Sequence, residues 1–353
     1  MFGNSEATRR DLAESEIASR RGATPFSHRL PPFSHSPLEM LRARAGAARG
    51  LAVGARRALS TAAAPISSLR VPIYQLDSFA SQTFRGNPAA VCPLDAWLPD
   101  ETLMAIADEN ALSETAFFVR DGSGYHLRWF TPTLEVAMCG HGTLATAALI
   151  LERMEPEAPE VAFSTLSGEL IVRRSAEDAS LLSLDFPQWP ASDAVEPNSD
   201  LVAAIGAAPT ACYPIPPCPV TKRWMHGAPF YLFEYDSEDA IKGLSPDCGR
   251  MILAEANVLA TAKSDQQGVD FVSRFFGPCS GIPEDPATGS AHTTLAPFWA
   301  SRLNKRRMEA RQLSGRGGEL TVELGPEGSG RVIISGRTAF YLEGSIFVPP
   351  ERQ

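Results

Sequence analysis

The sequence of 353 residues predicts an α/β protein made of two similarly built halves. This length suits two domains, each with enough residues for its own hydrophobic core. Segments that read as strands and helices recur on both sides of the Pro-rich stretch 187–220. Gly142-Thr143 precedes an apolar helix, and Gly289-Ser290 precedes another one 147 residues later. We therefore expect a pseudo-symmetric enzyme with its site in the cleft between the halves.

Composition and charge exclude several classes of protein. Hydrophobic residues make up 44% and charged residues 21%, which are ordinary globular values, and without an apolar run of about eighteen residues we expect no membrane span. Residues 1–70 hold eleven Arg, no Lys and five acids, a charge of +6, so the chain total of −9 leaves −15 for residues 71–353. No Lys/Arg cluster with interleaved aromatics follows, so we expect no nucleic-acid partner.

The six cysteines are few for this length. None stands in a C-x-x-C pair or near a histidine at zinc-like spacing. We therefore expect free thiols in a reducing compartment and no structural metal.

The segment 40–68 has the composition of an organelle transit peptide. It contains five Arg and no acid and is rich in Ala and Ser, which is typical of a basic amphipathic targeting helix. Residues 1–39 carry acids and several prolines, so we expect translation to start at Met40 in some products. The alternative is a disordered extension without an address. We therefore expect residues 1–68 to lie outside the fold. If they are a transit peptide, we expect the protein in the mitochondrion or plastid, and otherwise in the cytoplasm.

Residues 71–187 read as the first half. A turn-rich link at 84–88 joins the first two strands, and Asp100 is the expected N-cap of the first helix. A Ser167-Gly168 turn indicates an antiparallel pair. The expected strands are 71–79, 89–94, 111–119, 125–130, 161–165, 168–173 and 181–186, and the expected helices are 100–110 and the apolar stretch that ends near residue 153.

Residues 187–220 are Pro-rich and irregular, and we expect a domain boundary there. Beyond them the same kinds of elements return. The expected strands are 230–235, 258–262, 269–276, 310–313, 319–323, 331–334 and 338–348, and the expected helices are 246–255 and 292–303.

The stretch Cys139–Thr143 places a thiol, an imidazole and two glycines where an extended segment turns into an apolar helix. Backbone N–H groups and the positive end of a helix dipole converge there, which favours an anion. Thr143 is the expected helix cap, and His141 can move a proton or donate to a carboxylate. The alternative is a purely structural turn with a satisfied histidine.

Carboxylate and hydroxyl side chains cluster in 284–290, at the start of the helix that follows Gly289-Ser290. An acid at a helix start complements the dipole, which explains one of them as a structural cap. It does not explain Asp285, Thr288 and Ser290 together, so the pattern indicates a second anchor for a ligand.

Glu114 lies between a helix and the apolar run 116–119. A carboxylate packed against an apolar strand loses solvation and holds its proton more tightly, which suits a general base. The alternative is a hydrogen-bonded residue at a strand edge.

Cys139 is the other candidate base. A racemase that works with two thiols needs one on each face of the substrate carbon, and the repeat aligns Cys139 with Pro286. That mechanism is therefore broken, and Cys139 is expected to be a small buried packing residue rather than a nucleophile.

Together these stretches resemble the PhzF family, the phenazine-biosynthesis-like proteins of the diaminopimelate epimerase fold. The similarity covers about residues 71–348. The stretches that carry it are Gln75–Phe79, Gly86–Val91, Ala111–Thr115, Met138–Thr143 and Glu284–Ala291.

The resemblance implies two domains, 71–187 and 188–348, each an antiparallel sheet curled around a central helix. It also implies a homodimer without a cofactor. The family's isomerase uses a glutamate, matched by Glu114, to move a proton on an amino-hydroxy-cyclohexadiene carboxylate. The organellar address makes phenazine synthesis itself an unexpected role.

We therefore expect a cofactor-independent isomerase that acts on a small unsaturated or amino carboxylic acid. Two alternatives stay open: a thiol-based racemase or epimerase that uses Cys139, and a non-catalytic metabolite-binding or interaction protein. By resemblance the catalytic residues are Glu114, His141 and Asp285, the substrate-binding residues are Gly140, Gly142, Gly289 and Ser290, and there is no metal ligand.

Overall fold

A computed structural model describes residues 68–217 and 228–349. All of them lie within one compact unit, Ala64–Gln353. The predicted transit peptide, apart from its final residue, lies outside the described residues. Among the helices that the structure describes, none combines the length and apolar character needed to cross a bilayer.

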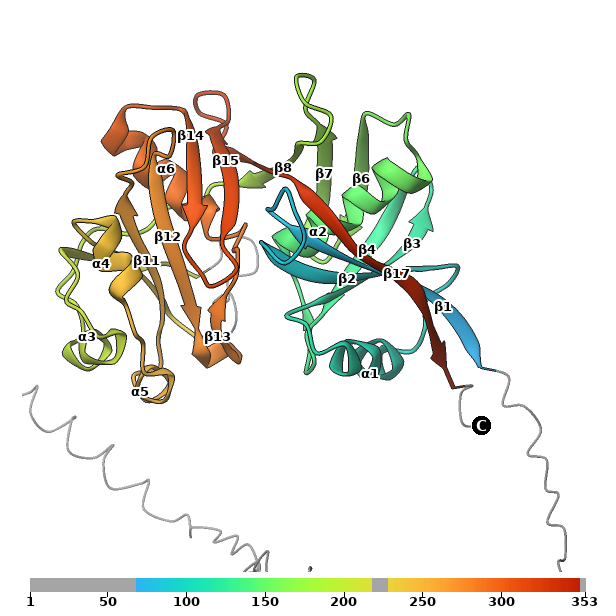
Figure 1. Cartoon of the computed structure of the whole chain (residues 1–353), viewed down its shortest axis with the longest axis horizontal. Coiled ribbons are helices and arrows are strands. Elements are labelled where there is room, and N and C mark those ends of the chain that lie inside the picture. The colour runs from blue at the N-terminus through green and yellow to red at the C-terminus, as the bar shows by residue number, and fades with distance from the viewer. Residues whose placement is uncertain (1–67, 218–227, 350–353) are drawn as a thin grey trace, which may run out of the picture. The chain divides into compact units, whose positions relative to one another are not determined.

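The first half begins with two strands, continues through two β-α-β passages and closes with a hairpin pair (Figure 1). Its elements are β1 (Leu69–Ser78), β2 (Asn87–Leu94), α1 (Asp100–Asn110), β3 (Thr115–Asp121), β4 (Gly124–Phe130), β5 (Glu135–Val136), α2 (Gly140–Leu149), the π-helix η1 (Ile150–Met154), β6 (Glu160–Thr165), β7 (Gly168–Arg174) and β8 (Leu182–Pro187).

The second half follows the same order with two additional short helices. Its elements are α3 (Ser199–Ile205), β9 (Ala211–Ile215), β10 (Phe230–Glu234), α4 (Glu238–Gly243), α5 (Cys248–Leu253), β11 (Asn257–Lys263), β12 (Phe271–Gly277), the 3₁₀ turn η3 (Pro278–Ser280), β13 (Ile282–Asp285), α6 (His292–Leu303), β14 (Arg307–Gln312), β15 (Gly318–Leu324), β16 (Arg331–Gly336) and β17 (Thr338–Val348).

The two halves repeat one pattern of strand pairing. In the first half β1–β2 is antiparallel, β2–β3 parallel, β3–β4 antiparallel and β4–β6 parallel, and β7 and β8 follow antiparallel. Strands β9, β10, β11, β12, β14, β15 and β16 repeat this series. The repetition confirms the pseudo-symmetric α/β fold, although each half is a mixed sheet rather than the wholly antiparallel one that we expected.

Strands also join the halves. The last strands of the two repeats, β8 and β16, pair antiparallel. The chain then returns to the first half, where β17 pairs with β1 along its whole length (Figure 1). The predicted second domain, 188–348, includes β17, so the last strand of this domain belongs to the sheet of the first half. The domain limits stay a prediction.

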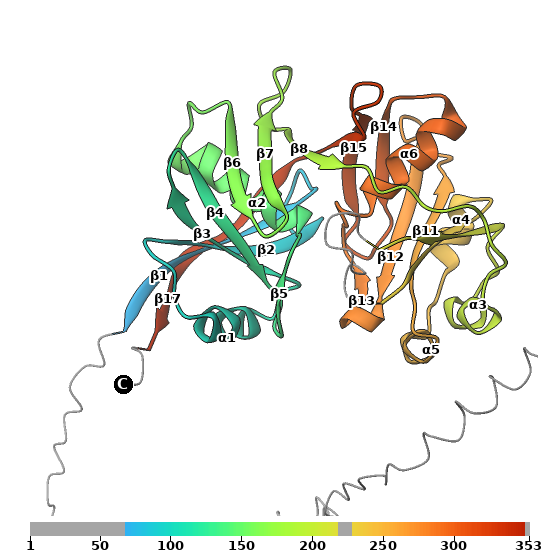
Figure 2. The same cartoon turned by 180° about the vertical axis from the view of Figure 1, so that it is seen from behind.

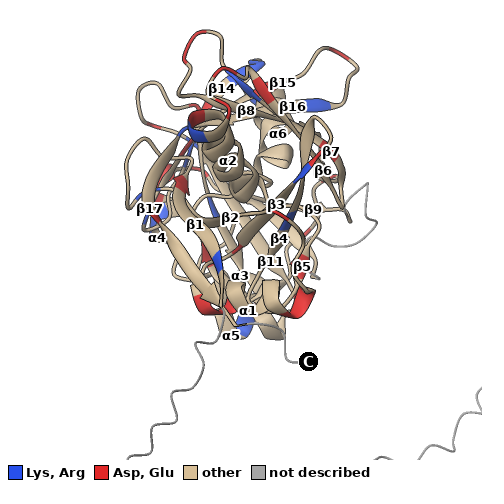
Figure 3. Cartoon of the chain, turned by 90° about the vertical axis from the view of Figure 1, so that its right-hand side faces the viewer, with Lys and Arg blue, Asp and Glu red and all other residues tan. Residues whose placement is uncertain are grey.

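The helices α2 and α6 occupy the centres of the two halves (Figure 2). Every residue of α2 is buried, and the helix contains no charged side chain (Figure 3). A helix that is apolar all round must be enclosed on every side. The strands of the first half therefore enclose α2. In α6 eight of the twelve residues are buried, the first ones among them, so both helix starts belong to the interior.

Two expected helix caps are wrong. Pro99 is the N-cap residue of α1 and makes no side-chain cap bond, while Asp100 is the first helical residue. At α2 the N-cap is Cys139, whose sulfur accepts a hydrogen bond from the Gly142 N–H at 3.3 Å. The Thr143 hydroxyl points backward and donates to the Cys139 carbonyl.

Several stretches differ from the expected elements, and the strand expected at 111–119 begins only at Thr115. The region 187–220 contains α3 and β9, although its prolines indicated irregular chain. The expected helix to residue 153 ends as a π-helix after Leu149. The hairpin between β6 and β7 turns at 166–167, one residue before the expected position, because Thr165 pairs with Gly168.

Candidate active site

Glu114 stands directly before β3 and is only 4% exposed. Burial, and after it the nearby charge of Asp285, raises the pKa of Glu114 to about 8. Its Oε2 atom is buried, and the polar atom beside it is His141 Nε2 at 3.2 Å. A carboxyl group of this kind is ready to exchange a proton near neutral pH.

His141 is the second residue of α2 and is 6% exposed. The Ser78 hydroxyl donates to its carbonyl oxygen at 2.7 Å and fixes the helix start. Its Nε2 lies 3.2 Å from Glu114 Oε2. Burial lowers the pKa of His141 to about 3. Both shifts favour neutral groups, so at neutral pH this pair holds an uncharged imidazole and a protonated carboxyl rather than an ion pair.

Asp285 ends β13 in the second half and is also buried. Asn87 donates to its Oδ1 at 2.9 Å, and the Thr288 hydroxyl donates to its Oδ2. Burial raises the pKa of Asp285, while these two donors lower it. The amide of buried Gln312 holds the loop, because it donates to the Asp285 carbonyl at 2.6 Å and accepts from the Thr288 N–H at 2.7 Å.

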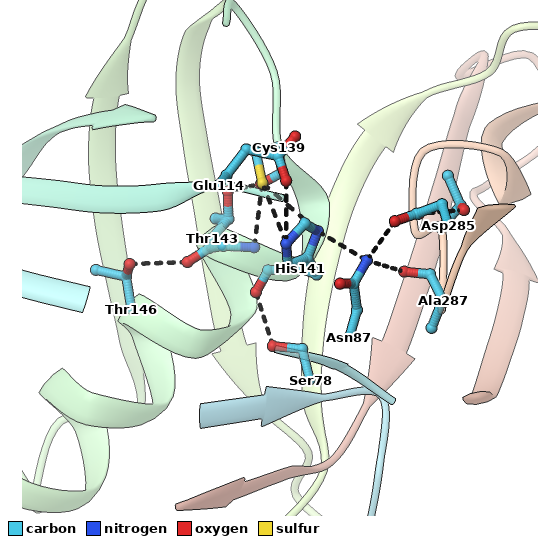
Figure 4. Close-up of polar contacts among 11 residues, drawn as sticks. Ser78, Asn87, Glu114, Cys139, His141, Thr143, Thr146, Asp285 and Ala287 are labelled. Atoms are coloured by element: carbon cyan, nitrogen blue, oxygen red, sulfur yellow. Dashed lines mark hydrogen bonds and ion pairs between the residues drawn. The ribbon is translucent and has the colours of Figure 1, made fainter. Parts of the chain in front are cut away.

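The structure thus brings all three predicted catalytic side chains into one buried cluster (Figure 4). Asn87 links His141 to Asp285, since its Nδ2 lies 3.3 Å from His141 Nδ1. Glu114 and His141 come from the first half, and Asp285 comes from the second.

The predicted glycines lie at two different contacts. A Cβ on Gly140 would lie 3.5 Å from the Gly289 Cα atom, so these two backbones touch. A Cβ on Gly289 would lie 2.8 Å from the Phe79 ring. Gly142 faces Trp129 and the thiol of the preceding turn instead. The glycine that contacts Gly289 is therefore Gly140.

The strand register agrees with the alignment that the sequence repeat gave. Phe163 of β6 pairs with β4, and Ala310 of β14, 147 residues later, pairs with β12 in the corresponding way. Cys139 therefore corresponds to Pro286, and a second thiol is lacking opposite it.

Two other predicted residues of 284–290, Ser290 and Glu284, lie in different surroundings. Ser290 is buried at the turn before α6, where its carbonyl accepts from Thr293 Oγ1 at 2.7 Å. Glu284 lies in β13 and forms a two-pronged pair with Arg274 at 2.7 and 2.9 Å. Glu284 is therefore held in a structural pair, and its expected place at the helix start is wrong.

Cys139 is a buried free thiol beside the same cluster. Burial, and after it the charge of Glu114, holds the pKa of Cys139 well above its ordinary value, against the lowering effect of the Gly142 N–H. Ligand atoms of Glu114, Cys139 and His141 all lie within 4.8 Å of one another. Oxygen, nitrogen and sulfur at such spacing also suit a metal such as zinc, whereas the sequence spacing predicted no metal.

Two cavities in the described part of the chain lie elsewhere. The larger, of about 410 Å³, is lined by Phe79, Arg85, Lys242 and Arg316 among others, and the smaller measures about 150 Å³. The cluster of Glu114, His141 and Asp285 lines neither. With the helix starts in contact, the cluster is closed to solvent in this structure.

Comparisons with known proteins identify the family. The sequence profile of the phenazine biosynthesis-like proteins, PhzC-PhzF, matches residues 76–344. The chain belongs to this family.

Relatives of this PhzF-family protein span its folded part. An uncharacterized isomerase of Pseudomonas aeruginosa is 46% identical over 279 residues, which are 79% of this chain and 99% of the relative. A human phenazine biosynthesis-like domain-containing protein is 38% identical over 299 residues, 79% of this chain and 99% of that protein. Since relatives from Pseudomonas and Halalkalibacterium are named isomerases, this PhzF-family chain is an enzyme of the isomerase class.

Solved structures agree on the fold. A PhzF-family protein from Enterococcus faecalis superposes with a TM-score of 0.70 at 36% identity, covering 79% of this chain and all of that one. A hydroxyproline epimerase from Agrobacterium vitis, at 12% identity and a TM-score of 0.50, covers 79% of this chain and 93% of its own. At that identity the PhzF-family chain shares the epimerase's fold alone.

Proposed function

We propose that this PhzF-family protein is a cofactor-independent isomerase in which Glu114 moves a proton on a small unsaturated or amino carboxylic acid. The observation that carries the proposal is the Glu114 carboxyl group. It is buried, its Oε2 lies 3.2 Å from His141 Nε2, and burial raises its pKa to about 8. A base whose pKa lies near the working pH both takes up and returns a proton readily.

The neighbouring groups support both steps of such a transfer, the removal and the return of the proton. In its ionised form, which a pKa of about 8 keeps accessible near neutral pH, Glu114 would take a proton from one carbon of the substrate and return it to another, so composition is conserved and no redox partner is needed. His141 and Asp285 lie on either side of Asn87, where they can stabilise charge that develops on the substrate. The N-termini of α2 and α6 offer N–H groups and positive dipole ends to a carboxylate, beside Gly140, Gly142, Gly289 and Ser290.

The test is hydrogen exchange in D₂O with a panel of small unsaturated and amino carboxylic acids. We expect one class of acid to acquire deuterium with the wild type and to lose this exchange with Glu114→Gln. Glu109→Gln, an exposed acid on α1, is the matched control and should exchange like the wild type. Exchange retained by Glu114→Gln would remove this carboxyl group from the mechanism.

A thiol mechanism is the second candidate, because Cys139 Sγ lies 3.6 Å from His141 Nδ1. Burial disfavours the thiolate that such a mechanism needs. Cys139→Ala distinguishes the two, since a Glu114 base leaves measurable exchange in this variant and a thiol base does not.

A role in metabolite binding without turnover is the third outcome of the same panel. An acid that raises the melting temperature but acquires no deuterium would favour it. An acid that does both would support the isomerase.

Assembly as a homodimer is part of the proposal, and β17 offers a surface for it. Tyr341, Leu342 and Phe347 are exposed on this strand, and Phe347 is 70% exposed. Exposed apolar side chains gathered on one strand mark an interface more often than single ones do. Phe347→Lys should shift the sedimentation coefficient from dimer to monomer, while Leu253→Lys, at an exposed position on α5, should not.

The organellar address stays a proposal on composition alone, from residues 40–68. A fluorescent fusion of residues 1–68 should enter an organelle. The same fusion with the five Arg of 40–68 replaced by Gln should stay in the cytosol. Diffuse signal from both would contradict the address.

A further inference from the structure

Asn87 opens β2 at the junction of the two halves and is fully buried. The residue before it, Gly86, has φ of +62°, and a Cβ there would lie 2.1 Å from the Ser78 carbonyl oxygen, so this turn requires glycine. Arg316 of the second half holds the turn from outside and donates to the Gly86 carbonyl at 2.8 Å. The turn thereby directs the Asn87 amide inward, between His141 and Asp285 (Figure 4).

Two contacts establish which atom of this amide is the nitrogen. Nδ2 of Asn87 lies 2.9 Å from Asp285 Oδ1 and 3.0 Å from the Ala287 carbonyl oxygen. A carbonyl oxygen only accepts, so the amide atom that faces it must be the NH₂ group. The same NH₂ group lies 3.3 Å from Nδ1 of His141. Because the group has two hydrogens for three acceptors, this ring nitrogen shares one of them with an oxygen, and it faces a donor.

The thiol of Cys139 is a second group on that side of the ring, 3.6 Å from His141 Nδ1. Burial keeps the thiol protonated because it raises the Cys139 pKa. A hydrogen on Nδ1 would oppose the NH₂ group of Asn87, so Nδ1 carries the lone pair and accepts. The ring proton is then on Nε2, which lies 3.2 Å from Glu114 Oε2.

We infer that Asn87 is a positioning residue that holds His141 in the Nε2–H tautomer, facing Glu114, and ties this ring to Asp285. Its importance for turnover rests on the proposed function, whereas the tautomer does not. With the proton on Nε2, His141 can donate to the Glu114 carboxylate that forms when the proton leaves. With the proton on Nδ1, the Nε2 lone pair would repel that carboxylate.

The test is ¹⁵N NMR of imidazole-labelled protein between pH 6 and 8, with the His141 signal assigned through His141→Gln. The wild type should show Nε2 protonated and Nδ1 free. Asn87→Asp keeps the shape but replaces the donor by an acceptor, and should move the proton to Nδ1. Asn87→Ala removes the donor and should lower the ratio of Nε2–H to Nδ1–H about fivefold, the effect of one hydrogen bond.

The control is Asn257→Asp, the same change at a fully buried amide whose contacts are with Cys279 and Ser280. It should leave the His141 signals unchanged. If Asn87→Asp does not fold, Asn87→Ala decides. A proton on Nδ1 in the wild type, or the wild-type tautomer in every folded Asn87 variant, overturns the inference. Absence of deuterium exchange with any acid would instead refute the proposed isomerase and leave the tautomer result standing.

Discussion

The raised pKa of Glu114 predicts that Glu114→Gln becomes more stable than the wild type as the pH rises. The folded protein holds the Glu114 proton up to about pH 8, whereas an ordinary glutamate releases it near 4.5. Between these values the folded state binds a proton that the unfolded state lacks, so wild-type stability falls with rising pH. The slope is about 1.4 kcal/mol per pH unit.

Glutamine has the shape of a protonated glutamic acid and does not titrate, so the variant escapes this loss. The two proteins should be about equally stable at pH 5. At pH 8 the variant should be ahead by about 4 kcal/mol, which is three pH units at the slope of linkage. Urea unfolding followed by circular dichroism at pH 5, 6, 7 and 8 measures the difference.

Glu109→Gln is the matched control. Because this side chain is exposed, the difference in free energy of unfolding between this variant and the wild type should not change with pH. If the free energy of unfolding of Glu114→Gln also differs from that of the wild type by the same amount at every pH, within about 1 kcal/mol, the reasoning that burial holds the proton on Glu114 is refuted.

For His141→Gln the pH dependence of the stability difference has the opposite sign. The pKa of His141 is lowered from 6.5 to about 3, so wild-type stability falls as the pH drops through this window and the variant should gain below pH 6.

Three further predictions concern the packing of the cluster. Asn87→Ala leaves two buried acceptors without their donor, and urea unfolding at pH 7 should show a loss of about 2–6 kcal/mol; a loss below about 1 kcal/mol would contradict the assigned bonds. Gly289→Ala places a methyl group 2.8 Å from the Phe79 ring, and calorimetry should show about 1–3 kcal/mol of destabilisation, whereas Gly315→Ala, with open space around it, should show none. Cys139→Ala removes the N-cap acceptor of α2 and should cost about 0.5–2 kcal/mol in urea unfolding; an unchanged midpoint would argue against this cap.

Local pattern in the sequence is sufficient for the elements whose residues decide them alone. Helix α6 begins and ends at the predicted residues 292 and 303, because an Ala/Leu/Trp-rich run follows a glycine turn and ends before Asn304 in the left-handed conformation. Strand β17 also has its predicted limits. The proline density of 187–220 indicates irregular chain, but α3 begins there at an Asn198 cap and β9 is stabilised by pairing with β10.

The candidate site could be predicted only in part. The burial of Glu114 followed from its apolar neighbours, but the contact of Asn87 with Asp285 joins residues 198 positions apart, and nothing in local pattern reports it. Gln312 gave no signal, since one glutamine at the end of an alternating strand resembles any other. Thr143 is the expected cap because threonine is a common capping residue, whereas the structure shows that the Cys139 sulfur accepts the bond.

The two halves share a fold but have different side chains at corresponding strand starts. Glu114 precedes β3, and the start of the corresponding strand β11 holds Asn257. Both groups of that amide have local partners, as its Oδ1 accepts from the Cys279 N–H at 3.1 Å and its Nδ2 donates to Ser280. The first half thus supplies a buried carboxyl group beside the His141 ring, and the second supplies a satisfied amide there.

This asymmetry bears on the kind of isomerisation. A racemase that inverts a carbon needs proton donors on two opposite faces, and a symmetric pair of bases at the two strand starts would meet that need. Here the proposed base at one strand start has a neutral amide as its counterpart, and the acid that the second half contributes, Asp285, is held by donors from Asn87 and Thr288. In the proposed mechanism a single carboxyl group takes and returns its proton on one face of the substrate. The arrangement therefore favours a proton shift between two carbons over inversion at one.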